Sequence, residues 1–200
     1  MNEEVCFIGL DISTSIIGVC LLNSEQEIVN LSAINLKKTK NIFDKSVIVR
    51  DYIINLKNLH VFNNNCKISI EEAFQSFRKG FSSAKTLSQL NRFNGIVSYL
   101  VYDIFNIEPV YINVNSARKN LQIKINKSLD KNTKQQVFDW VRDNIEFNWP
   151  EKILKSGPNK GLVKFDESCY DMSDAYVICK ALIFNENNNT WKNQFFRRYY

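Results

Sequence analysis

The sequence predicts an α/β protein with a five-stranded mixed sheet flanked by helices. Three observations support this. Apolar, β-prone runs fill the first 35 residues, later apolar runs alternate with segments of helical period, and two of the runs end in an acidic residue. The order of elements, three strands followed by a helix, a strand, a helix, a strand and further helices, is typical of such a sheet. No internal repeat or convincing domain boundary interrupts it.

The N-terminal part predicts a three-stranded meander followed by a helix. The runs at 5–11, 16–22 and 26–35 are apolar and separated by short polar turns. Between residues 41 and 62, apolar residues recur near helical period, so we expect a helix there.

The remaining chain predicts two more strands and four helices. Lys67–Glu71 is a short apolar strand, Ser83 opens a long helix to about Phe105, and Pro109–Val114 is the fifth strand. The segments that follow are a short helix near 116–121, a helix over 133–146, a loop over 149–166 and a final helix over 167–185. We therefore expect one domain over residues 1–185 and a basic, aromatic C-terminal tail over 186–200, flexible at least through its asparagines.

The composition is that of an ordinary globular chain. Of its 200 residues, 44% are hydrophobic and 24% are charged, and no apolar run is long enough to span a bilayer. Five cysteines with mostly apolar neighbours predict reduced thiols in a cytoplasmic compartment, and the single His60 argues against zinc. We also expect no secretion signal, because the first residues lack positive charge. The Asn-, Lys- and Ile-rich usage hints at an AT-rich genome, such as that of a phage in a bacterial host or another virus.

Basic residues gather in two segments. Residues 118–134 carry six bases and one acid, and residues 78–92 carry four bases and no acid. A solvated basic face explains such clusters most simply. Nucleic acid becomes the better interpretation if an active site lies among these segments.

Acidic residues stand at three unusual places. Asp11 ends the first apolar strand, Glu71 and Glu72 end the fourth, and Asp171 and Asp174 lie three apart on an apolar helix, so they share one face. Ligand sites gather at the ends of strands in open α/β sheets. If the first and fourth strands are neighbours, their terminal acids lie in one crevice, and a helix across those ends adds the other two.

Carboxylates gathered in one cleft repel each other, and desolvation adds to the cost. Mg²⁺ or Mn²⁺ relieves that cost, since hard cations prefer oxygen ligands. Two such ions about 4 Å apart activate a water and stabilise the leaving oxygen in phosphodiester hydrolysis. Each acid alone has a simpler explanation as a turn former, a helix-dipole partner or a solvated side chain. The inference rests on their joint pattern.

The chain resembles the RuvC family of Holliday-junction resolvases, within the ribonuclease H-like superfamily, over roughly residues 5–185. The motifs are IGLDISTSIIGVCLL, ISIEEAF and DMSDAYVI, in this order. The resemblance implies a ribonuclease H-like fold in which Asp11, Glu71, Asp171 and Asp174 are catalytic and bind two Mg²⁺ or Mn²⁺ ions.

The resemblance also implies two residues that act on the DNA. The motif KQQVFDWV places Lys134 near the scissile phosphate, and Phe74 falls where the family has an aromatic wedge for the junction. Phe77 and Phe81 either assist it or pack in the core. The residues that we expect on backbone phosphates are Arg78, Lys79, Lys85, Arg92, Arg118, Lys119, Lys124, Lys127 and Lys131.

The resulting hypothesis is a metal-dependent endonuclease that resolves four-way junctions by paired cuts, as a homodimer that matches the two-fold symmetry of the junction. The 83–105 helix, with Ile96, Val97, Leu100 and Val101, either forms the dimer interface or belongs to the core. Three further functions stay open: a nuclease for other branched DNA or RNA–DNA hybrids, a nucleic-acid-binding protein without nuclease activity, and an actin-like or sugar-kinase ATPase, which LDISTS loosely resembles.

Overall fold

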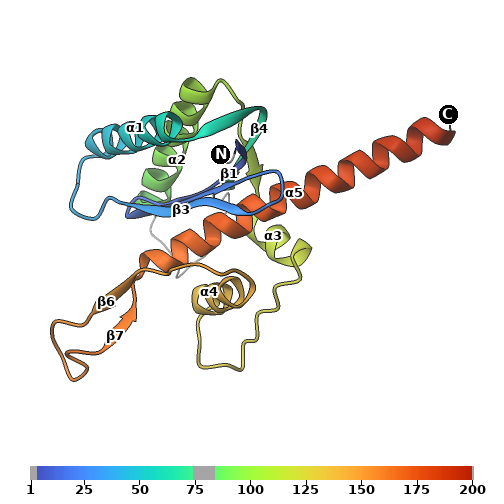
Figure 1. Cartoon of the computed structure of the whole chain (residues 1–200). Coiled ribbons are helices and arrows are strands. Elements are labelled where there is room, and N and C mark those ends of the chain that lie inside the picture. The colour runs from blue at the N-terminus through green and yellow to red at the C-terminus, as the bar shows by residue number, and fades with distance from the viewer. Residues whose placement is uncertain (1–3, 74–83, 200) are drawn as a thin grey trace.

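The computed structural model describes residues 4–73 and 84–199, with side chains described as far as Asn188. Its centre is a five-stranded sheet in the order β3-β2-β1-β4-β5 (Figure 1). The strands are β1 (Glu4–Ile12), β2 (Ile16–Leu22), β3 (Ile28–Asn35), β4 (Val61–Glu71) and β5 (Val110–Ile112). The predicted five-stranded mixed sheet is confirmed.

The strand pairing brings two of the acid-bearing strand ends together. β1 pairs antiparallel with β2, and β2 with β3, which confirms the meander, whereas β1 pairs parallel with β4 and β4 with β5. Leu10 lies opposite Ile70 across β1 and β4. The next residues along these strands, Asp11 and Glu71, therefore lie beside each other at one edge of the sheet.

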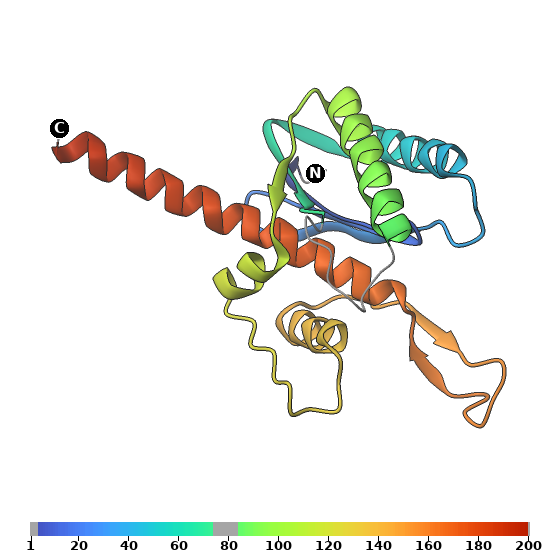
Figure 2. The same ribbon diagram turned by 180° about the vertical axis from the view of Figure 1, so that it is seen from behind.

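Helices cover both faces of the sheet. In Figures 1 and 2, α1 (Ile42–Leu59) and α2 (Ala84–Phe105) lie above it, and α3 (Val114–Asn120), α4 (Thr133–Asn144) and α5 (Ser168–Tyr199) lie below. Each face has its own buried cluster. Side chains alternate along a strand, so Ile8 and Leu10 pack against α1 and α2 while Cys20 and Leu22 pack against α5.

Helix α5 lies unusually close to the sheet. A Cβ atom on Gly18 would be 1.9 Å from the carbonyl oxygen of Asp171, and one on Gly9 would be 2.4 Å from that of Ala175. The third small residue, Ser69 of β4, has its hydroxyl 3.3 Å from the carbonyl oxygen of Ile178. Only strands without larger side chains at these points permit this approach.

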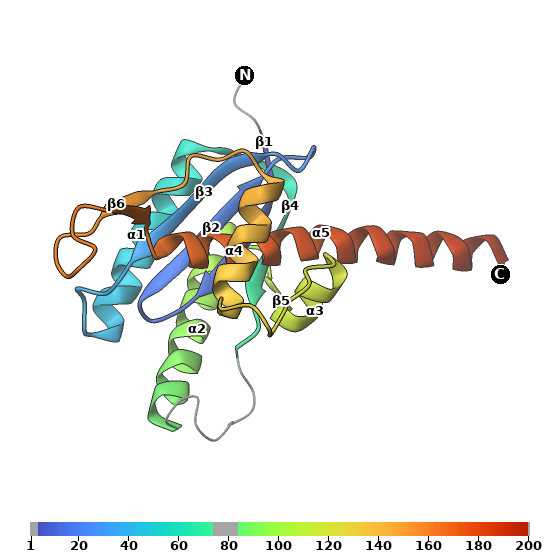
Figure 3. The same ribbon diagram turned by 90° about the horizontal axis from the view of Figure 1, so that it is seen from below.

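The final helix is longer than the sequence predicted. It does not end near Asn185 but continues to Tyr199, so the segment expected as a separate tail is helical and projects beyond the sheet (Figure 3). The segment after Gly161 contains neither glycine nor proline. Asparagine lowers helix propensity only modestly, so the asparagine run does not stop the helix.

The predicted loop over 149–166 contains a β-hairpin, formed by β6 (Glu151–Ile153) and β7 (Val163–Phe165). The prolines and glycines that suggested a loop lie before and within its turn, where Gly157 and Gly161 adopt positive φ angles of 81° and 92°. The other helices and strands begin and end within a few residues of the predicted limits, except β4, which extends back to Val61.

Two expectations from composition can be compared with the structure. All five cysteines are free thiols, four of them buried, which agrees with the prediction of reduced thiols. Within the described ranges, no helix combines the length and the apolar character needed to cross a bilayer.

We predict that Gly18→Ala destabilises the protein by about 1–3 kcal/mol, because the added methyl group meets a backbone carbonyl of α5 that cannot rotate away. Gly95→Ala on α2 is the matched control. Its Cβ meets nothing within 4 Å, so it should stabilise the helix by about 0.8–1 kcal/mol. Denaturant unfolding measures both. A Gly18→Ala variant as stable as the wild type would show that α5 does not pack this closely.

Candidate active site

Four acidic side chains from three elements meet at the edge of the sheet where β1 and β4 end. Asp11 and Glu71 come from these strands, Asp171 lies in the first turn of α5, and Asp174 follows one turn later. The three aspartates are at most 7% exposed. The structure therefore brings together all four acids that the sequence analysis selected, and their catalytic role stays a prediction.

The electrostatics of the cluster show strong mutual repulsion. Burial raises the pKa of Asp11 well above its ordinary value, and the negative charge of Glu71, which also accepts a hydrogen bond from the protonated Asp11, raises it further. Burial and then Glu71 raise the pKa of Asp174 to about 6. Without added positive charge, the cluster holds protons that isolated carboxyl groups would lose.

Lys134 supplies positive charge from α4. Its Nζ lies 3.2 Å from Oδ1 of Asp171, and its side chain is 55% exposed. Partial burial alone would lower the pKa of Lys134, but the neighbouring carboxylates, Asp171 foremost, hold it above its ordinary value. The residue stands in the first turn of α4, after the N-cap Asn132, where the helix dipole disfavours a cation. The acidic cluster compensates for that position.

Arg118 approaches the cluster from α3. Its Nη2 lies 3.6 Å from Oδ1 of Asp174, and its side chain is only 17% exposed. The distance is too long for a hydrogen bond, and both Nε of Arg118 and Oδ1 of Asp174 are buried without a hydrogen-bond partner. In the structure Arg118 turns inward and faces Asp174, and its predicted contact with DNA phosphates stays a prediction.

Two asparagines that were not predicted as site residues contact the end of β4. Nδ2 of Asn94, buried in α2, lies 3.4 Å from the carbonyl oxygen of Glu71, and Nδ2 of Asn113 lies 3.4 Å from Oε2 of Glu72. An asparagine among apolar helix residues was the available signal, because a buried amide needs a partner. The glycines inside β1 and β2 were a second signal, for the close approach of α5.

The cluster fits a hard divalent cation in its chemistry. Its donors are all carboxylate oxygens, and the orphaned oxygen of Asp174 needs a positively charged or hydrogen-bonding partner. Among the residues that the structure describes, however, no three His, Cys, Asp or Glu side chains are already arranged to hold one ion. Lys134 and Arg118 provide the charge that faces Asp171 and Asp174 instead.

The other expected DNA contacts are spread over two regions. Lys85 and Arg92 are exposed on α2, and Lys119, Lys124 and Lys127 are exposed on α3 and the loop after it. Three other residues predicted to contact DNA lie outside the described ranges, namely Phe74, Arg78 and Lys79, and so do Phe77 and Phe81.

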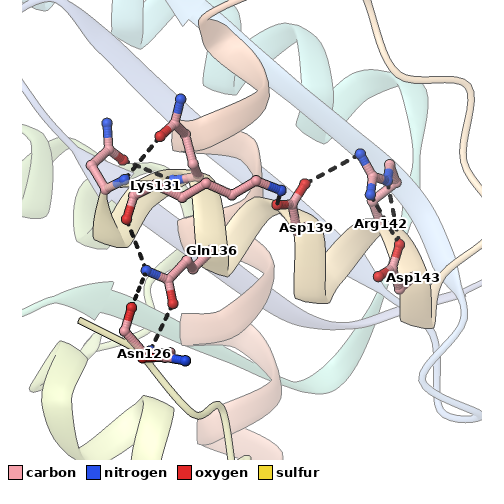
Figure 4. Close-up of polar contacts among 8 residues, drawn as sticks. Asn126, Lys131, Gln136, Asp139, Arg142 and Asp143 are labelled. Carbon is pink, nitrogen blue, oxygen red and sulfur yellow. Dashed lines mark hydrogen bonds and ion pairs between the residues drawn. The ribbon is translucent and has the colours of Figure 1, made fainter. Parts of the chain in front are cut away.

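The basic loop between α3 and α4 is braced by α4 (Figure 4). Nε2 of Gln136 donates to the carbonyl oxygens of Asn126 and Lys131, at 3.0 and 2.9 Å, and the backbone N–H of Asn126 donates to Oε1 of Gln136 at 2.8 Å. Lys131 itself is paired with Asp139 at 2.6 Å, and Asp139 also pairs with Arg142. Part of the charge of Lys131 is therefore used within the protein.

Comparison with known proteins identifies the fold. No protein-family model matches the sequence, and no curated protein matches it. Among solved structures, Thermus thermophilus RuvC in complex with a Holliday-junction substrate matches with a TM-score of 0.58 at 10% identity, over 94% of this chain and 98% of that one. The yeast mitochondrial Holliday-junction resolvase Ydc2 matches with a TM-score of 0.62 at 16% identity, over 100% of this chain and 86% of that one. The chain therefore has the ribonuclease H-like fold that the resemblance implied.

We predict that the cluster makes the cation-free protein less stable as the pH rises. The folded state holds the proton of Asp174 up to about pH 6, whereas the unfolded chain releases it near the ordinary pKa of 3.8. The contribution of Asp174 to the free energy of unfolding therefore falls between about pH 4 and 6. Urea unfolding in EDTA at several pH values measures the free energy of unfolding of the wild type and of Asp174→Asn. The free energy of the variant should fall less over this pH range.

Thermal unfolding tests the binding of the cation. Adding Mg²⁺ or Mn²⁺ at pH 8 should raise the unfolding temperature, because a ligand that binds only the folded state stabilises it. Asp11→Asn should reduce that gain, and Asp103→Asn, an exposed acid on α2, should leave it unchanged. An equal gain in Asp11→Asn would contradict the assignment of Asp11 as a ligand.

Proposed function

We propose that this protein is a metal-dependent endonuclease that resolves four-way DNA junctions. The observation that carries the proposal is the meeting of Asp11, Glu71, Asp171 and Asp174 at one sheet edge beside Lys134. The fold that holds this cluster is shared with RuvC solved on a Holliday junction and with a mitochondrial Holliday-junction resolvase. Fold and cluster together favour a four-way DNA junction as the substrate over an RNA–DNA hybrid or a nucleotide.

The acids would hold two Mg²⁺ or Mn²⁺ ions, with Asp11 and Glu71 fixed by the sheet and the two aspartates of α5 fixed by its packing. Such ions activate the attacking water and neutralise the oxygens of the reacting phosphate. Lys134 is half-exposed beside the acids and would stabilise negative charge that develops on the phosphoryl oxygens. Arg118 would keep Asp174 in place from the buried side.

The basic residues around the cluster would bind the junction arms. Lys119 is exposed on α3, Lys124 and Lys127 are exposed on the loop after it, and Lys85 and Arg92 are exposed on α2. None of these side chains has an ion pair with a described residue, so their charge is available to phosphates. We expect binding to weaken steeply with salt.

We predict that Asp11→Asn binds a synthetic four-way junction like the wild type but does not cut it, because it keeps the shape of the side chain and loses a charged ligand. The assay compares the junction, a linear duplex and an RNA–DNA hybrid, each with Mg²⁺ or EDTA. Cutting retained by Asp11→Asn would remove the mechanism. Preferred cutting of the hybrid would favour a ribonuclease that acts on RNA–DNA hybrids.

Lys134→Ala is the companion variant in that assay. Loss of one group that stabilises transition-state charge typically costs about 100- to 1,000-fold in rate. Its stabilisation by Mg²⁺ should persist, because Lys134 is not a ligand. Lys127→Ala, an exposed lysine on the braced loop, is the matched control and should affect junction affinity more than the rate at saturating enzyme.

We also propose a homodimer, formed by the outer face of α2. Val97 and Val101 are buried in the core below this helix, so they do not serve an interface. Tyr99 and Tyr102 instead stand 63% and 47% exposed, three residues apart on its outer side. A two-fold dimer would present two clusters to the two strands that must be cut.

Light scattering tests this interface. The wild type should have the mass of a dimer, and the double variant Tyr99→Glu and Tyr102→Glu should have that of a monomer, because charged groups do not pack in an apolar contact. Tyr111→Ser, an exposed tyrosine on β5, is the control. A monomeric wild type would contradict the dimer.

A further inference from the structure

The β6–β7 hairpin is a basic ribbon that has no role in the proposed function. It projects from the body of the protein (Figure 3), and every residue from 155 to 165 is exposed. Residues 151–165 contain four lysines and one glutamate. The sequence alone predicts a loop here.

The base of the hairpin is firmly attached to α4. The ring of Phe165 lies edge-on to the ring of Phe138, with centroids 5.0 Å apart, and the guanidinium of Arg142 lies 5.8 Å from the centre of the Phe165 ring. The backbone N–H of Asp166 donates to the carbonyl oxygen of Pro150 at 2.8 Å. These contacts hold the ribbon in a defined direction, so its charges are presented at a constant place.

Most of the positive charge of the ribbon is not neutralised by described residues of the protein. Lys152 lies near Asp166 and Glu167, but the amino groups of Lys155, Lys160 and Lys164 make no hydrogen bond or ion pair with any described residue. Lys164 also stands directly opposite Lys152 across the two strands, where like charges destabilise a strand pair. Asp166 and Glu167 offset the charge of Lys152, whereas the charge of Lys164 has no described partner and is available to an external anion.

The ribbon ends close to the start of α5, whose first turn carries Asp171. β7 ends at Phe165, three residues before α5 begins, and three residues span at most about 10 Å. In Figures 1 and 3 the hairpin and the basic 121–132 loop lie on opposite sides of α4, whose first turn carries Lys134. A polyanion that reaches the cluster therefore has lysines on both sides of its path.

The dimensions fit a nucleic-acid backbone. Lys164 lies on β7 and Lys160 in the turn, four residues apart, so they are separated by at most about 13 Å at the rise of a strand. Phosphates follow one another every 3.4 Å along one strand of B-DNA, so the lysines of the ribbon can contact a stretch of about four of them.

We propose that the β6–β7 hairpin binds the phosphate backbone of the duplex arm beside the cleavage point, through Lys155, Lys160 and Lys164. The inference rests on the proposed function for its substrate and adds a contact surface to it. The competing occupant is a protein surface, because Ile153 and Val163 are 64% and 56% exposed on the other side of the ribbon. Lys155, Lys160 and Lys164 favour DNA, because all three are exposed and none has an ion pair with a described residue.

The test is a triple variant, Lys155→Gln, Lys160→Gln and Lys164→Gln, with the triple Lys→Arg variant as its matched control. Affinity for a four-way junction and for a linear duplex is measured in EDTA over a range of salt concentrations. The Gln variant should lose on the order of 10-fold in affinity for both DNAs, and its slope of log K against log salt should fall by up to about 0.9 per lysine. The Arg variant should keep both values, and all three proteins should have the same unfolding temperature.

The outcomes separate this inference from the proposed function. Wild-type affinity and slope in the Gln variant would overturn the inference, whether or not the protein cuts junctions. A wild type that binds duplex through these lysines but cuts no junction would support the hairpin and contradict the nuclease. The inference would be overturned in favour of a protein interface by two results together. DNA binding would be unchanged in the Gln variant, and the mass of the protein in solution would change in Ile153→Ser and Val163→Ser.

Discussion

The close contact between α5 and the sheet is the constraint on which the rest of this structure depends. Gly9 and Gly18 leave no side chain where the backbone of α5 passes, and the carbonyl oxygens of Asp171 and Ala175 occupy that space. A larger residue at either position would lift the helix away from the strands. Asp171 and Asp174 would then no longer lie over Asp11 and Glu71, because a helix moves as a rigid element when its packing surface changes.

This packing brings negative charges together, and two cations offset part of their repulsion. Lys134 reaches the cluster from the first turn of α4, and Arg118 reaches it from the end of α3. Both are imperfect solutions, since Arg118 and Asp174 each keep a buried polar atom without a hydrogen bond. Repulsion that is only partly compensated is what gives a carboxylate site affinity for divalent cations. The same feature that lowers the stability of the cation-free fold thus serves the proposed chemistry.

Much of the fold could be predicted from local patterns. The meander over the first 35 residues and the helices over 42–59 and 133–144 follow from apolar periodicity. The structure adds a capping box between Asn132 and Gln135 at the start of α4. The long C-terminal helix and the hairpin were missed for local reasons too. Asparagines were given too much weight as helix breakers, and the prolines and glycines around the hairpin turn concealed two short strands on either side of it.

The sequence by itself determined which acids end apolar strands, which faces are apolar and in what order the elements follow. The tertiary structure alone decided which side chains meet. Asp11 and Asp174 are more than 160 positions apart, and no local rule states that α5 crosses the end of β1 at its first two turns. The tertiary structure also decided that Arg118 turns inward and that Lys131 pairs with Asp139, while Lys155, Lys160 and Lys164 of the hairpin face solvent. The physical reason is that a charged residue carries the same sequence signal whether it is exposed or paired, and only the packing of distant elements determines its neighbours.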